Sequence, residues 1–81
     1  MLWIIEETDD CGVHWRRAEL TYCYPRADSA ILDALVIVAD EWQPSTRSLR
    51  QLGHALQRES VAYYWHKGIR IVRIDHAVST R

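Results

Sequence analysis

Residues 45–58 read STRSLRQLGHALQR, and their spacing predicts an amphipathic helix. At about 3.6 residues per turn, Leu49, Leu52 and Leu56 fall on one side and can pack on a core. The other side carries basic and polar side chains without an acid, namely Arg47, Arg50, Gln51, His54, Gln57 and Arg58. The pattern indicates a helix anchored by leucines that offers a surface for binding rather than for catalysis.

The start and the continuity of this helix depend on a few residues. Pro44 prevents a simple continuation of the preceding segment, and Ser45 or Thr46 can cap the new helix. Gly53 costs about 1 kcal/mol relative to alanine inside a helix. The segment is therefore either one helix or two short helices that meet at Gly53.

The following residues, SVAYYWHKGIRIVRID (60–75), predict a β-hairpin with a two-residue loop at Lys67 and Gly68. This register pairs Trp65 with Arg70, which would touch at the rim of the core. The face expected in the core consists of Val61, Tyr63, Trp65, Arg70, Val72 and Ile74.

Before Pro44, a helix is predicted from a cap at Asp28 or Ser29 to about Trp42. The stretch ALVIVA (34–39) could form a strand, but the length of the pattern and its cap favour a helix. The expected apolar face comprises Ile31, Leu35, Val38, Ala39 and Trp42, widened by Leu32 and Val36. Ile37 then falls on the acidic side.

The first part of the chain predicts another hairpin. Residues 2–7 favour a strand, residues 8–12 favour a turn, and residues 13–24 read as a longer strand that Pro25 ends. The order is hairpin, helix, helix, hairpin. We therefore expect one small two-layer α+β domain over residues 1–81, with both helices on one face of an antiparallel sheet.

Charge is unevenly distributed, although the net charge is only −1. Residues 1–42 carry nine acids and three arginines, a net −6, and residues 43–81 carry seven bases and two acids, a net +5. Opposed halves suggest either two surfaces for two partners or halves that neutralise each other in the fold.

The N-terminus and the cysteine content favour a reduced, cytoplasmic protein without a membrane partner. The start MLWIIEETDD lacks the basic region of a signal peptide. No apolar run approaches the roughly 20 residues that span a bilayer. Small secreted domains usually carry more than the two cysteines found here, Cys11 and Cys23.

The basic side of residues 45–58 fits contact with nucleic acid. Arginine and lysine neutralise phosphates, and arginine and glutamine also read base edges. The candidate residues are Arg47, Arg50, Gln51, His54 and Arg58 on the helix, with Lys67 and Arg73 on the hairpin. The alternative, a solvated surface helix, is weakened by the absence of any acid among these side chains.

A resemblance supports the same hypothesis. The run STRSLRQLGHALQRESVAYYWHKGIRIVRI (45–74) is similar to the helix-plus-wing end of winged-helix domains, including the domains at the end of phage and plasmid replication primases. The matching residues are Leu49, Leu52, Gly53 and Leu56 in the helix and Gly68, Arg70 and Ile74 in the hairpin. The resemblance implies a winged-helix-like DNA-binding regulator of phage or mobile-element type. A winged-helix domain has another short helix between its first helix and its recognition helix. Only residues 43–45 stand at that place in this chain, unless residues 45–58 break at Gly53 into two short helices.

The acidic half suggests a different function, the binding of a host protein or nucleoprotein complex. Phage inhibitors of host defence, of the anti-CRISPR type, can imitate nucleic acid with such a surface. The candidate residues are Glu6, Asp9, Asp10, Asp33, Ile37, Asp40 and Glu41, with Ile37 as an exposed anchor. An ordinary solvated acidic surface explains the same residues, and a homodimer is a further arrangement that the sequence allows.

A metal site is a weaker hypothesis. Cys11, His14 and Cys23 form one pattern of ligand spacing, to which His54, His66 or His76 could add a fourth ligand. Structural zinc sites usually have two tight pairs, so we expect no metal. Cys23 is interpreted as a buried free thiol.

Catalytic motifs are absent from the sequence: it has no nucleophile elbow, phosphate loop or His-Glu metal helix. Asp75 and His76 are interpreted as a local hydrogen bond. We therefore expect a non-enzymatic binding protein without a cofactor. A small ribonuclease toxin is a remote alternative, and its candidate residues are His54, Tyr64 and His66.

Overall fold

Strands from opposite ends of the chain form the centre of an antiparallel sheet. In the computed structural model, which describes residues 2–18 and 23–74, β1 (Leu2–Thr8) pairs with β4 (Lys67–Ile74) along its whole length. The short strands β2 (Arg16–Arg17) and β3 (Val61–Tyr64) complete the order β2-β1-β4-β3. The two hairpins therefore share one sheet, which gives both of them a common core.

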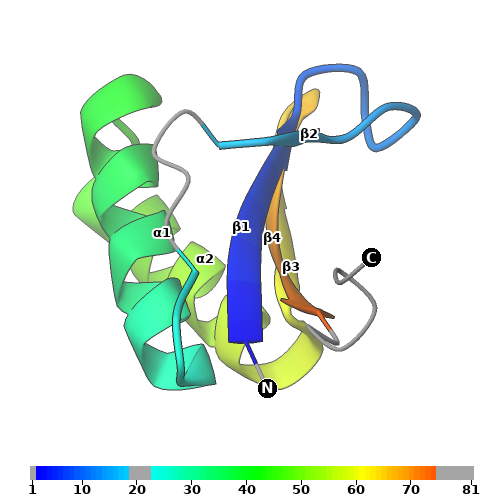
Figure 1. Ribbon diagram of the computed structural model, residues 1–81. Helices are drawn as coiled ribbons and strands as arrows, with labels where there is room; N and C mark the ends of the chain where they lie inside the picture. Colours follow the sequence, from blue (N-terminus) through cyan, green and yellow to red (C-terminus); the bar gives the residue numbers. More distant parts are fainter. Residues whose placement is uncertain (1, 19–22, 75–81) are drawn as a thin grey trace.

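Two helices, α1 (Ala27–Glu41) and α2 (Thr46–Glu59), cover one face of this sheet (Figure 1). The predicted order and the two-layer α+β class are confirmed. The core between the layers comprises Ile5, Ala62, Ile69 and Ile71 from the sheet and Ala30, Ile31, Ala34, Val38, Leu52 and Leu56 from the helices.

The inward face of α1 is centred on small side chains. Ala30 and Ala34 are completely buried, whereas Leu32 and Val36 are 66 % and 65 % exposed. Alanine lets a helix approach its neighbours closely, so the contact line follows the alanines rather than the largest apolar residues. Ile37 is half-buried and packs against the core, so the prediction that it is exposed on the acidic side is wrong.

The ends of α1 also differ in detail from the prediction. Its N-cap is Arg26, which makes no side-chain capping bond, so the expected cap at Asp28 or Ser29 is wrong. Residues 34–39 are helical as predicted, but Ala39 is exposed instead of belonging to the apolar face.

The second helix is continuous through Gly53. The side chain of Ser45 accepts a hydrogen bond from the backbone N–H of Ser48 at 3.1 Å and caps α2, as predicted. A Cβ at Gly53 would lie 3.3 Å from Cδ1 of Leu35, so this glycine marks the close approach of α1 and α2. Only residues 42–45 separate the two helices, and the extra helix of a winged-helix domain is not present there.

The register of the second hairpin corrects the prediction. Tyr64 pairs with Lys67, so Trp65 and His66 form the two-residue loop instead of Lys67 and Gly68. Gly68 is a buried strand residue. The core face consequently carries Ala62, Ile69 and Ile71, and the face predicted to be buried lies away from the helices.

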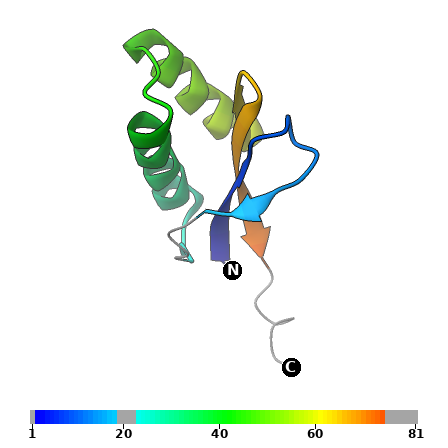
Figure 2. The ribbon, with the colours of Figure 1, turned by 90° about the horizontal axis from the view of Figure 1, so that it is seen from above.

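The first hairpin is also shorter than expected. Glu6 pairs with Arg17 and Glu7 with Arg16, but residues 13–15 belong to the preceding loop. A single bridge joins Trp3 to Tyr24 further along, and residues 19–22 of the predicted strand lie outside the described residues. Figure 2 shows the long loop that follows β1 on the side of the sheet opposite the helices.

Candidate nucleic-acid interface

The exposed side of α2 forms what we call the basic stripe: Arg47, Arg50, Gln51, His54 and Arg58. All five side chains are exposed. Leu52 and Leu56, at 5 % and 0 % exposure, hold the opposite side of the helix in the core and so fix the direction of the stripe. The sequence periodicity predicted this arrangement correctly.

The arginines of the basic stripe form no ion pair among the described residues. Within residues 2–18 and 23–74, the four ion pairs involve His14, Arg16, Arg26 and Arg70, and none involves α2. Glu59 is the only acid in the helix and lies at its last residue. Arg47, Arg50 and Arg58 can therefore offer their guanidinium groups to an external anion.

Most of the acidic candidates, in contrast, are engaged within the protein. Glu6 forms an ion pair with Arg70 at 2.6 Å. Asp33 accepts a hydrogen bond from the hydroxyl of Tyr24 at 2.7 Å. Asp9 lies 3.7 Å from Arg16. These acidic side chains therefore have a role within the fold, and less acidic surface is left for a partner.

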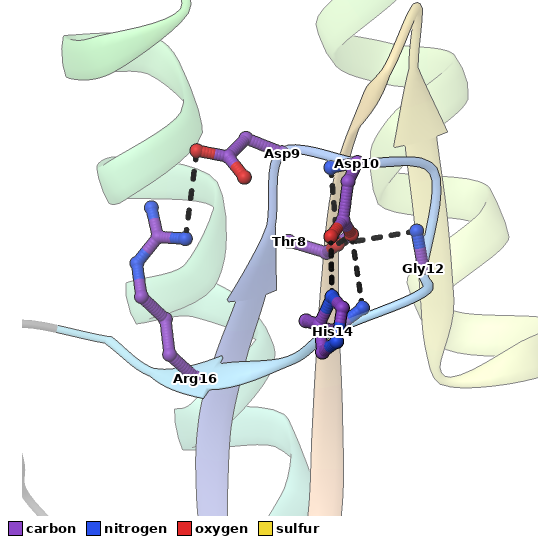
Figure 3. A network of polar contacts seen from close by, with 6 residues as sticks. All are labelled: Thr8, Asp9, Asp10, Gly12, His14 and Arg16. Atoms are coloured by element: carbon purple, nitrogen blue, oxygen red, sulfur yellow. Dashed lines mark hydrogen bonds and ion pairs between the residues drawn. The ribbon is translucent and has the colours of Figure 1, made fainter.

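Asp10 organises the loop that follows β1 (Figure 3). Its Oδ1 accepts hydrogen bonds from the Thr8 hydroxyl at 2.6 Å and from the His14 backbone N–H at 2.9 Å, and its Oδ2 lies 2.8 Å from Nδ1 of His14. The Thr8 oxygen also accepts from the backbone N–H of Gly12 at 3.1 Å. The Thr8 bond first, and then the two His14 contacts, hold the pKa of Asp10 well below its ordinary value.

The remaining acidic candidates, Asp40 and Glu41, are exposed at the end of α1. Ile37, predicted as their apolar anchor, is half-buried and therefore cannot serve as one. The exposed large apolar residues of α1 are Leu32 and Val36.

The two basic residues expected on the hairpin do not lie together. Lys67 begins β4 beside the loop, whereas Arg73 is near the other end of the strand. They are six positions apart along the strand, which is about 20 Å. Lys67 therefore lies beside the hairpin tip, whereas Arg73 lies too far away to form a basic cluster with it.

The structure reveals an aromatic pocket that the sequence did not predict. Trp42, Tyr64, Trp65, His66 and Lys67 line a cavity of about 370 Å³ at the tip of the second hairpin. The pocket combines the residue that follows α1 with β3, the β3–β4 loop and the start of β4, so no single sequence pattern contains it. The high tryptophan and tyrosine content was its only signal.

Arg70 does not contact Trp65 as predicted. Its guanidinium carbon lies 4.1 Å from the centroid of the Trp15 ring, on the sheet face opposite the helices. The shifted register moves Arg70 away from the loop, and Trp65 is 83 % exposed instead.

The metal and ribonuclease hypotheses gain no support from the described residues. Cys11 and Cys23 are both exposed, so the buried thiol predicted for Cys23 is wrong, and its Sγ accepts a hydrogen bond from Arg17 at 3.3 Å. No group of three metal-ligating side chains forms within residues 2–18 and 23–74. Tyr64 and His66 line the aromatic pocket, but His54 does not. Asp75 and His76 lie outside the described residues.

Comparison with known proteins shows no relative of this chain: no family model, curated protein or solved structure matches it. Neither α1 nor α2 is long and apolar enough to cross a bilayer, and these are the helices of the described residues.

Proposed function

We propose that this protein binds DNA through the basic stripe of α2. The observation that carries the proposal is an asymmetry of charge pairing. Arg47, Arg50 and Arg58 are exposed without an ion pair in the described part of the chain, while Glu6, Asp9, Asp10 and Asp33 are held by internal partners. An exposed cationic helix of this kind is suited to a polyanion.

The spacing of the stripe suits one side of a DNA groove. Arg47 and Arg58 are eleven residues apart, which is about three turns and about 16 Å along the helix, and they project in nearly the same direction. Guanidinium groups at both ends can contact phosphates, and Arg50 and Gln51 between them carry the donor and acceptor groups that read base edges. Lys67 adds a phosphate contact at the hairpin tip.

The proposal keeps only the general form of winged-helix binding, in which a helix and an adjoining β-hairpin contact DNA. The order of a leucine-anchored helix followed by a β-hairpin supports it. The continuity of α2 through Gly53 leaves no extra helix between α1 and α2. We therefore propose DNA contact by a helix with an adjoining hairpin, and an origin in a phage or mobile element follows only from the sequence resemblance.

Titration of the native protein with a short DNA duplex tests this proposal. Fluorescence anisotropy at about 50 mM and 200 mM salt should show binding that weakens steeply as salt increases, because each phosphate contact releases condensed counterions. Absence of any affinity for the duplex and for a single strand of the same length at the lower salt concentration would refute DNA binding.

A second candidate function, binding to a host protein, is favoured by a surface other than the predicted acidic one. Leu32 and Val36 are exposed one turn apart on α1, and Asp40 follows one turn later. Exposed apolar side chains in such a row can anchor a protein partner. This function is favoured if the native protein binds no DNA but keeps a protein partner after nuclease treatment, and if the Leu32→Asp variant loses that partner.

A further inference from the structure

The aromatic pocket offers ring faces in more than one orientation. Trp42 and Tyr64 lie nearly parallel, with an interplanar angle of 8° and centroids 6.1 Å apart. Trp65 meets Tyr64 edge-on at 73°, with centroids 6.4 Å apart. A planar ligand can therefore lie against one ring while a second ring contacts its edge.

Trp65 occupies a position that the stability of the fold does not explain. Its side chain is 83 % exposed, so it contributes little to the core. Its φ is +59°, in the left-handed region where glycine or asparagine is favoured at a hairpin loop. A large aromatic residue that is both exposed and conformationally strained points to a role in binding.

The charge of Lys67 at the pocket favours an anionic ligand. Lys67 lines the pocket beside His66, and no carboxylate of residues 2–18 and 23–74 does. Figure 1 shows the end of α1 and the start of α2 at the same end of the molecule as the β3–β4 loop. The basic stripe begins at Arg47, five residues after Trp42. A planar base that carries a phosphate satisfies both the rings and the ammonium group of Lys67.

We propose that the aromatic pocket binds an unpaired base of the DNA strand that the basic stripe holds. The base stacks on the exposed ring of Trp65, and the ammonium group of Lys67 contacts an adjacent phosphate. A base inside a duplex is stacked on both sides and cannot offer its face, so the ligand is single-stranded DNA or an unpaired nucleotide beside a duplex. This inference rests on the proposed function, because the stripe supplies most of the electrostatic affinity.

The Trp65→Asn substitution isolates the contribution of the ring. Asparagine tolerates the left-handed conformation and the site is exposed, so the fold should remain intact. The matched control is Tyr63→Ala. Tyr63 is an exposed aromatic residue of the same hairpin that does not line the pocket.

The experiment measures the affinity of both variants and of the native protein for oligo(dT) and for a duplex of equal length. Fluorescence anisotropy gives the affinities, and quenching of tryptophan emission reports stacking. We expect Trp65→Asn to weaken single-strand binding about ten-fold and to reduce the quenching. Duplex affinity and the dependence of single-strand binding on salt should change little, and Tyr63→Ala should bind as the native protein does.

The outcomes separate this inference from the proposed function. If the native protein binds DNA but Trp65→Asn binds oligo(dT) as tightly as the native protein does, the stacking role is wrong and the stripe remains the binding site. An equal loss for Tyr63→Ala would also overturn it, since the effect would then not belong to the pocket. If the native protein binds neither DNA form at low salt, the proposed function fails and the stacking role fails with it.

Discussion

The guanidinium group of Arg70 forms two contacts with the same oxygen of Glu6, from Nε at 2.8 Å and from Nη2 at 2.6 Å. The two residues lie opposite each other in the central strand pair β1–β4 and therefore join the first hairpin to the last. Arg70 also stacks on Trp15 in the long loop after β1. One basic side chain thus holds a strand and a loop and neutralises an acid of the N-terminal half.

This relationship predicts that Arg70 stabilises the fold rather than binding DNA. The Arg70→Ala substitution should lower the free energy of unfolding by about 1–2 kcal/mol, because it removes the ion pair and the contact with the Trp15 ring. Arg70→Lys should recover only part of the loss, since lysine lacks the planar group. Urea denaturation of Arg70→Ala, Glu6→Gln and the double variant measures the coupling. Simply additive losses would contradict a direct interaction.

The leucines of α2 are predicted to dominate the stability of the helical layer. Leu52 is 5 % exposed, and Leu52→Ala should cost about 2–5 kcal/mol by leaving a cavity between α2 and the core. The neighbouring Gln51→Ala is the control and should change stability by less than about 0.5 kcal/mol, because Gln51 is exposed. Thermal or urea denaturation checks both values. A small effect at Leu52 would mean that α2 is not anchored as described.

Two glycines should respond in opposite ways to alanine. A Cβ at Gly68 would lie 2.8 Å from the Tyr63 ring and 2.9 Å from Cγ2 of the buried Thr8, so Gly68→Ala should destabilise the fold by about 1–3 kcal/mol. A Cβ at Gly53 would meet only the movable end of Leu35 at 3.3 Å. Gly53→Ala should therefore be neutral or stabilising by up to about 1 kcal/mol, through its higher helix propensity. Melting temperatures compare the two, and a stabilising Gly68→Ala would refute the close packing.

Gly68 also shows why the hairpin register could not be read from the sequence. A Lys-Gly pair between apolar runs is a turn signal. Here, however, a glycine is required because Tyr63 and Thr8 leave no space for a side chain, and not because the backbone has a positive φ. The loop instead contains Trp65, which takes the positive φ. A register set by tertiary packing is not visible in local propensity.

The helices were predicted with unequal success for a related reason. In α2 the large apolar residues are also the buried ones, so the leucine spacing located both the core and the basic stripe. In α1 the buried line runs through Ala30 and Ala34, and a count of large apolar residues rotated the expected face. The aromatic pocket could not be predicted because its residues follow α1 or belong to β3, the β3–β4 loop and the start of β4, and they meet only in the fold.

The Asp10 network predicts a pH dependence of stability. Hydrogen bonds from Thr8 and His14 lower the pKa of Asp10 below its ordinary value of 3.8. The carboxylate therefore stabilises the folded state above that value, and this stabilisation is lost as the pH falls below it. Melting temperatures measured from about pH 5 downwards should fall less steeply for Asp10→Asn than for the native protein. Parallel slopes would show that the network does not favour the ionised form.

The basic stripe gives the most direct test of function. Replacing Arg47 and Arg58 by glutamate should abolish DNA binding, because it reverses the charge at both ends of the stripe. Both side chains are exposed on the side of α2 opposite Leu52 and Leu56, so the melting temperature should change little. The control is the double variant Arg17→Glu/Arg26→Glu, which changes the net charge equally but alters two exposed arginines outside the stripe.

The comparison of these two variants separates local contact from overall charge. Neutralising substitutions at single arginines of the stripe should each lower the slope of log K against log salt by about 0.9, the value for one phosphate contact. If both double variants lose DNA binding to the same extent, net charge rather than the stripe governs the affinity. If only the Arg47/Arg58 variant loses it while both remain folded, α2 is the surface that contacts DNA, because the charge change is the same in both and only its place on the molecule differs.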